Sequence, residues 1–296
     1  MQAGSFFIVD VFAQRRFQGN QLAVVMAWPG LADREMQRIA QEMNYSETTF
    51  IISAEAGKAG FPVRIFTPKR EVPFAGHPTL GTAYIIARHV LSQPVSRVTL
   101  DLIVGPISVT IPPQEGKPEV MWMRQAAPRF GEVLDPGLIA ESLNLDKRDL
   151  VENLPVQEVS TGLPFIIAGL KSLDAIRRAA VDKAKYFRLV EKIEAKAILI
   201  FCQETYLAEN DLNVRMFADY YGVPEDPATG SANGCLAAYL VKHRVLGHAR
   251  VDVRVEQGHE IGRPSLLLLK AQEEDGGIEV NVGGTVIPVA RGEFLA

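Results

Sequence analysis

Two segments of the chain, about 150 residues apart, repeat one order of features. Residues 64–91 read RIFTPKREVPFAGHPTLGTAYIIARHVL, and residues 215–246 read RMFADYYGVPEDPATGSANGCLAAYLVKHRVL. Each segment opens with Arg-x-Phe, passes through a loop to a glycine, and enters a run of small apolar residues that contains Ala-Tyr and ends near Val-Leu. The second segment needs a short insertion to align with the first. Such a duplication predicts two similar domains related by pseudo-symmetry.

The length and composition of the chain suit this arrangement. The chain has 296 residues, enough for two domains of roughly 150 residues, and it is 47% hydrophobic and 22% charged, which allows a core in each half. Residues 114–118 (QEGKP) are polar and turn-rich, and they are the candidate boundary. We therefore expect domains over residues 1–116 and 117–281, with a last strand at about 282–296 returning to the first domain.

Short β-like runs alternate with a few helical patterns. Apolar residues at helical spacing predict a helix over 33–43 with Asp33 as its N-cap, and further helices are expected over 77–89 and 231–243. Runs of β-branched or aromatic residues predict strands over 6–12, 22–26, 49–52, 63–66 and 98–104.

The two helices that follow the repeated glycines are apolar on most faces, which is typical of helices buried at the centre of a domain. Their N-termini lie at Gly76-His77 and at Gly230-Ser231. Unpaired N–H groups and the positive end of the helix dipole make such termini suitable for binding anions. Two termini that face each other across a cleft between the domains would bind a substrate with a carboxylate.

Glu47 is the candidate acid/base. It lies in residues 44–50 (NYSETTF), between the amphipathic helix and the next strand. A glutamate at a strand entry beside a cleft is partly desolvated, which raises the pKa of its carboxyl and suits it to general acid/base catalysis. The alternative is an ordinary solvated loop glutamate.

His77, Asp226 and Ser231 are further candidates, each with a structural alternative. His77 could donate to a substrate oxygen or shuttle a proton with Glu47, or it could be a capping or surface histidine. Asp226 could accept a hydrogen bond from a substrate amine or hydroxyl, or it could only shape the Asp-Pro turn. Ser231 suits an N-cap, a role that is compatible with binding.

Several classes of protein are disfavoured. A net charge of −4 argues against a nucleic-acid binder, and no apolar stretch approaches the roughly 20 residues that a membrane-spanning helix needs. Two cysteines and the lack of a signal-peptide pattern predict a cytoplasmic protein with reduced thiols. His243 and His248 have no third zinc ligand at suitable spacing, and dinucleotide and phosphate-binding glycine motifs are missing, so we expect no metal and no cofactor.

Several short motifs of the chain form a recognisable set. The most specific are Pro73-Phe74-Ala75-Gly76-His77-Pro78 and Glu225-Asp226-Pro227-Ala228-Thr229-Gly230-Ser231-Ala232. The others are Asp10-Val11-Phe12, Gly19-Asn20, Met43-Asn44-Tyr45-Ser46-Glu47-Thr48, Arg64-Ile65-Phe66-Thr67-Pro68, Gln257-Gly258 and Glu260-Ile261-Gly262-Arg263-Pro264-Ser265. On these motifs the chain resembles the PhzF-like (phenazine biosynthesis) family along nearly its whole length.

The resemblance implies the diaminopimelate-epimerase fold: two similar α/β (α+β) domains, each a curled mixed sheet around a central helix, with the active site between them. It implies that Glu47 moves a proton on a small carboxylate-bearing metabolite similar to trans-2,3-dihydro-3-hydroxyanthranilate. His77, Asp226, Gly76 and Gly230-Ser231 would form the pocket, and homodimers are common among the relatives.

Related epimerases and racemases use two opposed thiols, and the positions that match those thiols here are Ala75 and Thr229. Cys235 lies beyond the turn, so a two-thiol mechanism is disfavoured. Gln21 departs from the family pattern, in which proline commonly follows Gly-Asn. Two alternatives to the isomerase stay open: a cofactor-independent epimerase or racemase with His77 as its second base, and a non-catalytic metabolite-binding protein of the same fold.

Overall fold

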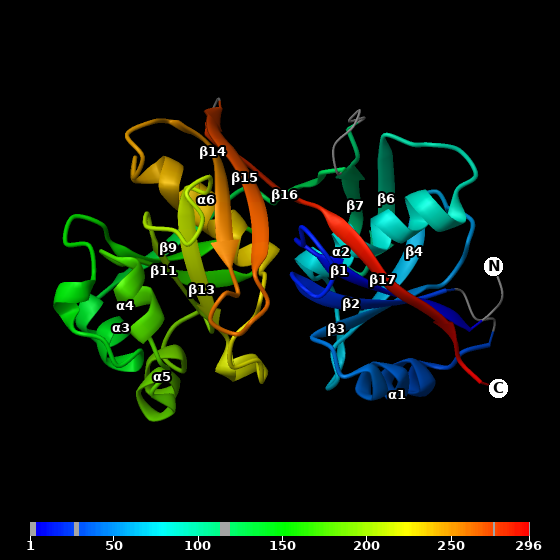
Figure 1. The fold of residues 1–296 in the computed structure, drawn as a ribbon, viewed down its shortest axis with the longest axis horizontal. Coiled ribbons are helices and arrows are strands. Elements are labelled where there is room, and N and C mark those ends of the chain that lie inside the picture. The colour runs from blue at the N-terminus through cyan, green and yellow to red at the C-terminus, as the bar shows by residue number, and fades with distance from the viewer. Residues whose placement is uncertain (1–3, 27–29, 113–118, 275, 296) are drawn as a thin grey trace. The chain divides into compact units, whose positions relative to one another are not determined.

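The computed structural model describes residues 4–26, 30–112, 119–274 and 276–295 (Figure 1). The chain forms two compact units: unit 1 comprises Met1–Met123 with Gly283–Ala296, and unit 2 comprises Arg124–Val282. The chain leaves unit 1 within β8 (Met121–Arg124) and returns to it within β16 (Gly277–Gly284). The candidate boundary at 114–118 lies within residues 113–118, which are outside the described part of the chain.

Unit 1 is a mixed sheet that curls around one helix. Its strands follow the order β17-β1-β2-β3-β4-β6-β7, with β2–β3 and β4–β6 parallel and the other neighbours antiparallel. The elements are β1 (Ser5–Val11), β2 (Asn20–Val25), α1 (Asp33–Met43), β3 (Glu47–Ile51), β4 (Phe61–Phe66), β5 (Glu71–Val72), α2 (Gly76–Ile85), the π-helical turn η1 (Ile86–Val90), β6 (Arg97–Leu102), β7 (Gly105–Thr110) and β17 (Val286–Glu293).

Unit 2 has the strand order β9-β10-β11-β12-β13-β14-β15, with β11–β12 and β13–β14 parallel. Helices α3, α4 and α5 gather on one side of it (Figure 1). The elements are β9 (Arg129–Leu134), α3 (Pro136–Ser142), η2 (Lys147–Asp149), β10 (Val156–Ser160), β11 (Pro164–Gly169), α4 (Leu173–Arg178), α5 (Lys183–Val190), β12 (Ile198–Cys202), β13 (Leu212–Phe217), η3 (Asp219–Tyr221), α6 (Gly230–Lys242), β14 (Arg250–Gln257) and β15 (Ser265–Glu274).

The two units share one topology. The run β1-β2-β3-β4-β6-β7 has the same order and the same strand directions as the run β10-β11-β12-β13-β14-β15. The helix after the repeated glycine, α2 or α6, packs on the strands of its own unit and is buried along most of its length. The predicted fold class, two similar units each built around a central helix, is therefore confirmed.

The repeated Arg-x-Phe motif forms the same ion pair in both units. Arg64 donates through Nε and Nη2 to both oxygens of Glu71 at 2.7 Å, and Arg215 makes the same bidentate contact with Glu225 at 2.9 and 2.8 Å. Each glutamate stands five residues before the glycine that begins the central helix. The pair therefore ties the end of one strand to the loop that leads into the helix.

The close approach of α2 to its sheet depends on glycine. A Cβ atom at Gly81 would lie 2.5 Å from Leu22 Cδ2 and 2.9 Å from Val11 Cγ2. These distances are shorter than side-chain contacts allow, so a larger residue would push the helix away from β1 and β2. The position of Gly76 and His77 at the start of α2 depends on this packing.

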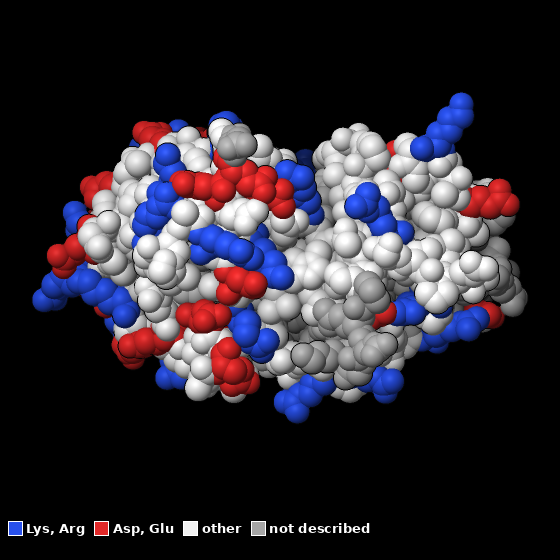
Figure 2. Space-filling model, turned by 90° about the horizontal axis from the view of Figure 1, so that it is seen from above, with Lys and Arg blue, Asp and Glu red and all other residues white. Residues whose placement is uncertain are grey.

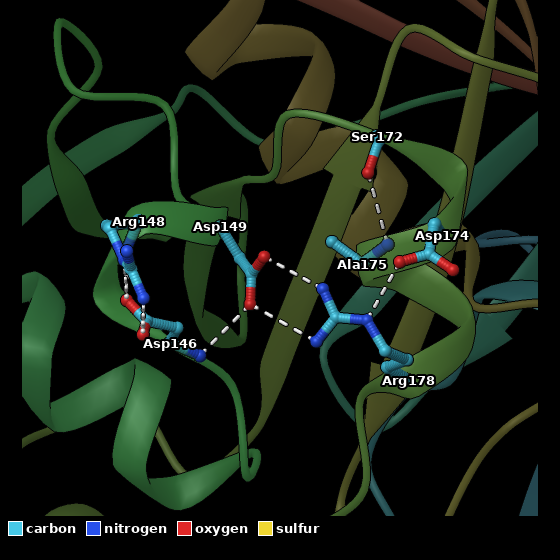
Figure 3. A network of polar contacts seen from close by, with 7 residues as sticks. All are labelled: Asp146, Arg148, Asp149, Ser172, Asp174, Ala175 and Arg178. Carbon is cyan, nitrogen blue, oxygen red and sulfur yellow. Dashed lines mark hydrogen bonds and ion pairs between the residues drawn. The ribbon is translucent and has the colours of Figure 1, made fainter.

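Charged side chains of both signs lie interspersed on the face drawn in Figure 2. One network joins η2 to α4: Arg178 binds Asp149 through Nη1 and Nη2 and Asp174 through Nε (Figure 3). Ser172 caps α4 by accepting the N–H of Ala175 at 3.2 Å. These contacts are structural ones at the surface, where solvent screens each ion pair.

Some sequence-based predictions of helix ends are wrong. Asp33 is the first residue of α1 and not its N-cap; Ala32 holds that position, and its N–H donates to Glu35 Oε2 at 2.9 Å. Ser231 is inside α6, because the helix begins at Gly230 with Thr229 as N-cap. Among the helices within the described ranges, none has the length and apolar character needed to cross a bilayer.

Candidate active site

In unit 1 the structure brings Glu47 and His77 together. Glu47 is the first residue of β3 and pairs with Leu22 of the parallel strand β2. His77 is the second residue of α2, which packs on the same strands. Glu47 Oε2 lies 3.5 Å from His77 Nε2, with 19% of the Glu47 side chain exposed and 6% of the His77 side chain. Glu47 is thus partly shielded, and the capping or surface alternative for His77 is wrong.

His77 is neutral and its tautomer follows from its contacts. Burial lowers the pKa of His77 to about 3, against a smaller opposing effect of a hydrogen bond to the backbone of Gln21. Within the described residues Nε2 makes no hydrogen bond, so the bond to Gln21 belongs to Nδ1. Because that bond favours the protonated ring, Nδ1–H donates to the Gln21 carbonyl. The lone pair of Nε2 is then directed to the side of Glu47.

The turn before α6 contains the unit 2 candidates. Asp226 is 7% exposed, and its Oδ2 accepts the Thr229 hydroxyl at 2.5 Å. Gly230 is buried and begins α6, while Ser231 is partly exposed at the second helical position. The first N–H groups of any helix lack partners within that helix, and Gly230 and Ser231 are the first two residues of α6.

The duplication shows which of these groups occur in one unit only. Thr48 pairs with Phe66 in unit 1, and Ile198 pairs with Phe217 in unit 2. Aligning the two Arg-x-Phe motifs therefore matches Glu47 with Ala197, a fully buried alanine. Aligning the repeated glycines, which lie beyond the short insertion, matches His77 with Ser231 and Ala75 with Thr229. The two units thus share a scaffold but differ in the side chains that can carry chemistry.

The family model described as phenazine biosynthesis-like protein (PhzC-PhzF) matches residues 9–292. The chain belongs to this family. It is 34% identical to a trans-2,3-dihydro-3-hydroxyanthranilate isomerase of Pseudomonas fluorescens, covering 98% of this chain and 99% of the relative. It is 32% identical to an uncharacterized isomerase of Clostridium acetobutylicum, covering 98% of both. The chain is accordingly an isomerase.

Solved structures agree with this membership. A phenazine biosynthesis protein of the PhzF family from Bacillus anthracis superimposes with a TM-score of 0.91 over 100% of both chains, at 29% identity. A probable proline racemase from Agrobacterium radiobacter, 11% identical, has a TM-score of 0.64 over 98% of this chain and 92% of that one. The second likeness concerns the fold alone, and it confirms the expected epimerase-like fold.

In this PhzF-family chain neither Cys202 nor Cys235 occupies a helix N-cap, where the racemase thiols would lie. Cys235 lies in the interior of α6, where burial raises the pKa of its thiol to about 12. Burial also raises the pKa of the Cys202 thiol, at the end of β12, to about 11. The two positions that match the racemase thiols, Ala75 and Thr229, are the N-caps of α2 and α6. Among the described residues, no three histidine, cysteine or acidic side chains are grouped to hold a metal ion.

Sequence reasoning missed the role of Gln257 in the family motif Gln257-Gly258. The side chain of Gln257 reaches the turn before α6, where it contacts Thr229 and Asn233 as well as the backbone of Asp226. The signal was present, because Gln257 was among the matching motifs, but a strand-end glutamine has no chemistry of its own to single it out.

Proposed function

We propose that this isomerase shifts a proton on a small ring metabolite that carries a carboxylate, of the trans-2,3-dihydro-3-hydroxyanthranilate type, with Glu47 as its acid/base. The substrate class comes from the named activity of the Pseudomonas relatives, which this chain matches over nearly its full length. The catalytic assignment rests on the partly shielded carboxyl of Glu47 beside the neutral ring of His77.

One carboxyl is sufficient for such a reaction. The carboxylate of Glu47 takes a proton from one carbon, and the electron pair of that C–H bond moves the neighbouring double bond. The same carboxyl then returns the proton to the carbon two positions away, so that no net oxidation occurs. His77 supports the protonated stage, since its Nε2 lone pair can accept a hydrogen bond from the carboxylic acid once the 3.5 Å separation shortens.

We assign binding roles to the other candidates. Asp226 would accept hydrogen bonds from an amine or hydroxyl of the substrate, and the N–H groups at Gly76 and at Gly230-Ser231 would bind its carboxylate. That both helix ends bind the same molecule stays a prediction, as does the homodimer, which light scattering on the purified protein would test.

The epimerase alternative is weaker. A two-base epimerase needs a second base opposite the first, whereas His77 is beside Glu47 and has a pKa of about 3, which makes it a poor base at neutral pH. In the other unit, the counterpart of Glu47 is Ala197, which cannot transfer a proton.

Substitution of Glu47 tests the proposal. Glu47→Gln keeps the shape and removes the titrating group, so turnover of trans-2,3-dihydro-3-hydroxyanthranilate should fall by about 100-fold or more while binding persists. Glu47→Asp should be nearly as damaging, because the carboxyl is withdrawn by one methylene. In D₂O, NMR should detect deuterium in the product of the wild type, because the carboxylic acid of Glu47 exchanges its proton with solvent between the two transfers.

Glu42→Gln, an exposed glutamate on α1, is the matched control and should retain wild-type kinetics. Near wild-type turnover by Glu47→Gln would exclude Glu47 as the acid/base. A wild-type protein that binds but does not convert the substrate would favour the metabolite-binding alternative.

A further inference from the structure

The amide of Gln257 is held by four polar contacts, all to the turn before α6 and its first residues. Its Oε1 accepts from Thr229 N at 3.1 Å and from Asn233 Nδ2 at 2.9 Å. Its Nε2 donates to the Asp226 carbonyl at 2.7 Å and to Thr229 Oγ1 at 3.2 Å. The side chain is fully buried, so each of these bonds forms away from water.

These contacts fix where the Thr229 hydroxyl directs its proton. Nε2 of Gln257 has only hydrogens to offer, so Thr229 Oγ1 accepts in that contact. The hydroxyl proton is then available for Asp226 Oδ2, which lies 2.5 Å away. The donors run in one direction, from Gln257 through Thr229 to the carboxylate of Asp226. A carboxylate that receives such a donor is stabilised in its ionised form and held in one orientation.

The other unit shows that the turn does not need this arrangement. Phe61 pairs with Leu100 in unit 1 and Leu212 with Val255 in unit 2, so the Arg-x-Phe alignment matches Gln257 with Leu102. Leu102 is buried and has no polar group.

Other contacts of the turn are common to both units. Thr79 Oγ1 donates to the Ala75 carbonyl at 2.7 Å, as Asn233 Nδ2 does to the Thr229 carbonyl at 3.0 Å. The Arg–Glu fork is also present twice. The glutamine occurs only in the unit that has Asp226, which argues against a general structural need for it.

The strand end that carries Gln257 is itself rigidly held. Gly258 has φ +79°, and a Cβ atom there would lie 2.6 Å from the Pro227 carbonyl oxygen. The preceding Glu256 is 1% exposed. Its carboxylate accepts from four donors: Tyr206 N, Leu207 N, Asn210 Nδ2 and Asn213 Nδ2. The backbone of Gln257 is therefore held in one position by its neighbours.

We propose that Gln257 and Thr229 are positioning residues of this isomerase, which orient the carboxylate of Asp226 and keep it ionised for substrate binding. The inference rests on the substrate-binding role proposed for Asp226. It adds a relay whose members touch Asp226 and not the reacting atoms.

Four variants separate the contributions. Thr229→Val removes the hydroxyl at nearly constant shape, whereas Thr229→Ser keeps the hydroxyl and removes only the methyl group. Gln257→Leu copies the unit 1 residue. Gln257→Glu keeps one acceptor oxygen but replaces the donor that faces Thr229 with a second acceptor, so that the hydroxyl turns away from Asp226. With trans-2,3-dihydro-3-hydroxyanthranilate, kcat/KM should fall about 10- to 100-fold in all but Thr229→Ser, mainly through KM.

The pH dependence distinguishes positioning from a loss of stability. Without the hydroxyl donor, Asp226 takes up its proton at higher pH, so the acid limb of kcat/KM moves to higher pH in Thr229→Val and Gln257→Leu. Carboxyl ¹³C NMR of the unliganded protein, assigned with Asp226→Asn, should detect the same displacement. Ser172→Ala, which removes the cap of α4 in the same unit, should lower stability without moving the pH profile of kcat/KM or the NMR titration of Asp226.

Two outcomes would overturn the relay: an Asp226 titration unchanged in Thr229→Val, or effects of Thr229→Val and Gln257→Leu that add in the double variant instead of overlapping. The NMR titration needs no substrate. If the wild type failed to convert the substrate, the proposed function would fail, while the titration would still decide whether Gln257 and Thr229 act on Asp226.

Discussion

The buried side chain of His77 makes the stability of the protein depend on pH. The histidine has an ordinary pKa of 6.5, and burial lowers it to about 3 in the folded protein. Above pH 6.5 both the folded and the unfolded chain hold His77 neutral, and it contributes nothing to pH dependence. Below pH 6.5 the unfolded chain binds a proton that the folded one rejects. Stability therefore falls as the pH is lowered towards 3.

His77→Asn should remove this dependence. Asn Nδ2 can donate to the Gln21 carbonyl as Nδ1 of the histidine does, and it does not titrate. Between pH 6.5 and 5, the wild type should lose about 2 kcal/mol more unfolding free energy than the variant, as measured by urea denaturation at each pH. His248→Asn controls for the loss of an exposed histidine. Parallel pH profiles of wild type and His77→Asn would contradict the burial argument.

The side chains of the site could be named from sequence, but their environment could not. Glu47, His77 and Asp226 follow from motifs, and their local neighbours follow from adjacent turns. The burial of His77 depends on β1 and β2, which precede it by more than fifty residues, so no local pattern reports it. Gln257 was hidden for the same reason, since it reaches Thr229 from a strand further along the chain.

At the scale of elements, the two Arg–Glu forks differ in burial. The side chains of Arg215 and Glu225 are 9% and 11% exposed, whereas those of Arg64 and Glu71 are both 26% exposed. Arg64 also has a second carboxylate partner in Asp33, at 2.5 Å. Removing one carboxylate should therefore leave a buried charge uncompensated in unit 2 but not in unit 1.

Glu225→Gln should cost about 3 kcal/mol of unfolding free energy, against about 1 kcal/mol for Glu71→Gln. The carbonyls of Ile176 and Ala179 also accept hydrogen bonds from Arg215. Because these bonds remain in Glu225→Gln, its loss of unfolding free energy is at the low end for a buried pair. Chemical denaturation of the two variants side by side measures the difference. Equal losses would mean that burial does not set the strength of the fork.

The helix and strand patterns were predictable where the sequence is periodic or β-branched. The central helices begin at Gly76 and Gly230 as the repeat indicates. Capping was not predictable at α6, because serine and threonine both suit an N-cap. Thr229 holds the position, but its hydroxyl serves Asp226 instead of a helix N–H. The short helices α3, α4 and α5 were missed, since each has fewer than three turns to display a period.

At the scale of the whole molecule, unit 1 is discontinuous. Strand β17 pairs with β1 along its length, and Thr285 accepts the N–H of Phe12 at 2.9 Å just before β17 begins. Phe294, which follows β17, packs on the cluster formed by α1 and the adjoining strands. The last residues of the chain thus complete the first unit.

A chain that ends at Gly284 should lose unit 1 selectively. Hydrogen exchange should show reduced protection of the β1 and β2 amides, while the amides of β10 to β15 keep theirs. A chain that ends at Glu293 retains β17 and serves as the control. Uniform loss of protection in both units would mean that they unfold as one cooperative structure.

The placement of β17 also sets an order of assembly during synthesis. Unit 2 is complete once Val282 has left the ribosome, so the later half of the gene yields the first finished unit. Until β17 emerges, β1 is an edge strand, paired with β2 on one side only, and its open side could pair with a neighbouring chain on the same polysome. The N-terminal unit therefore closes only after the whole of unit 2 has been synthesised.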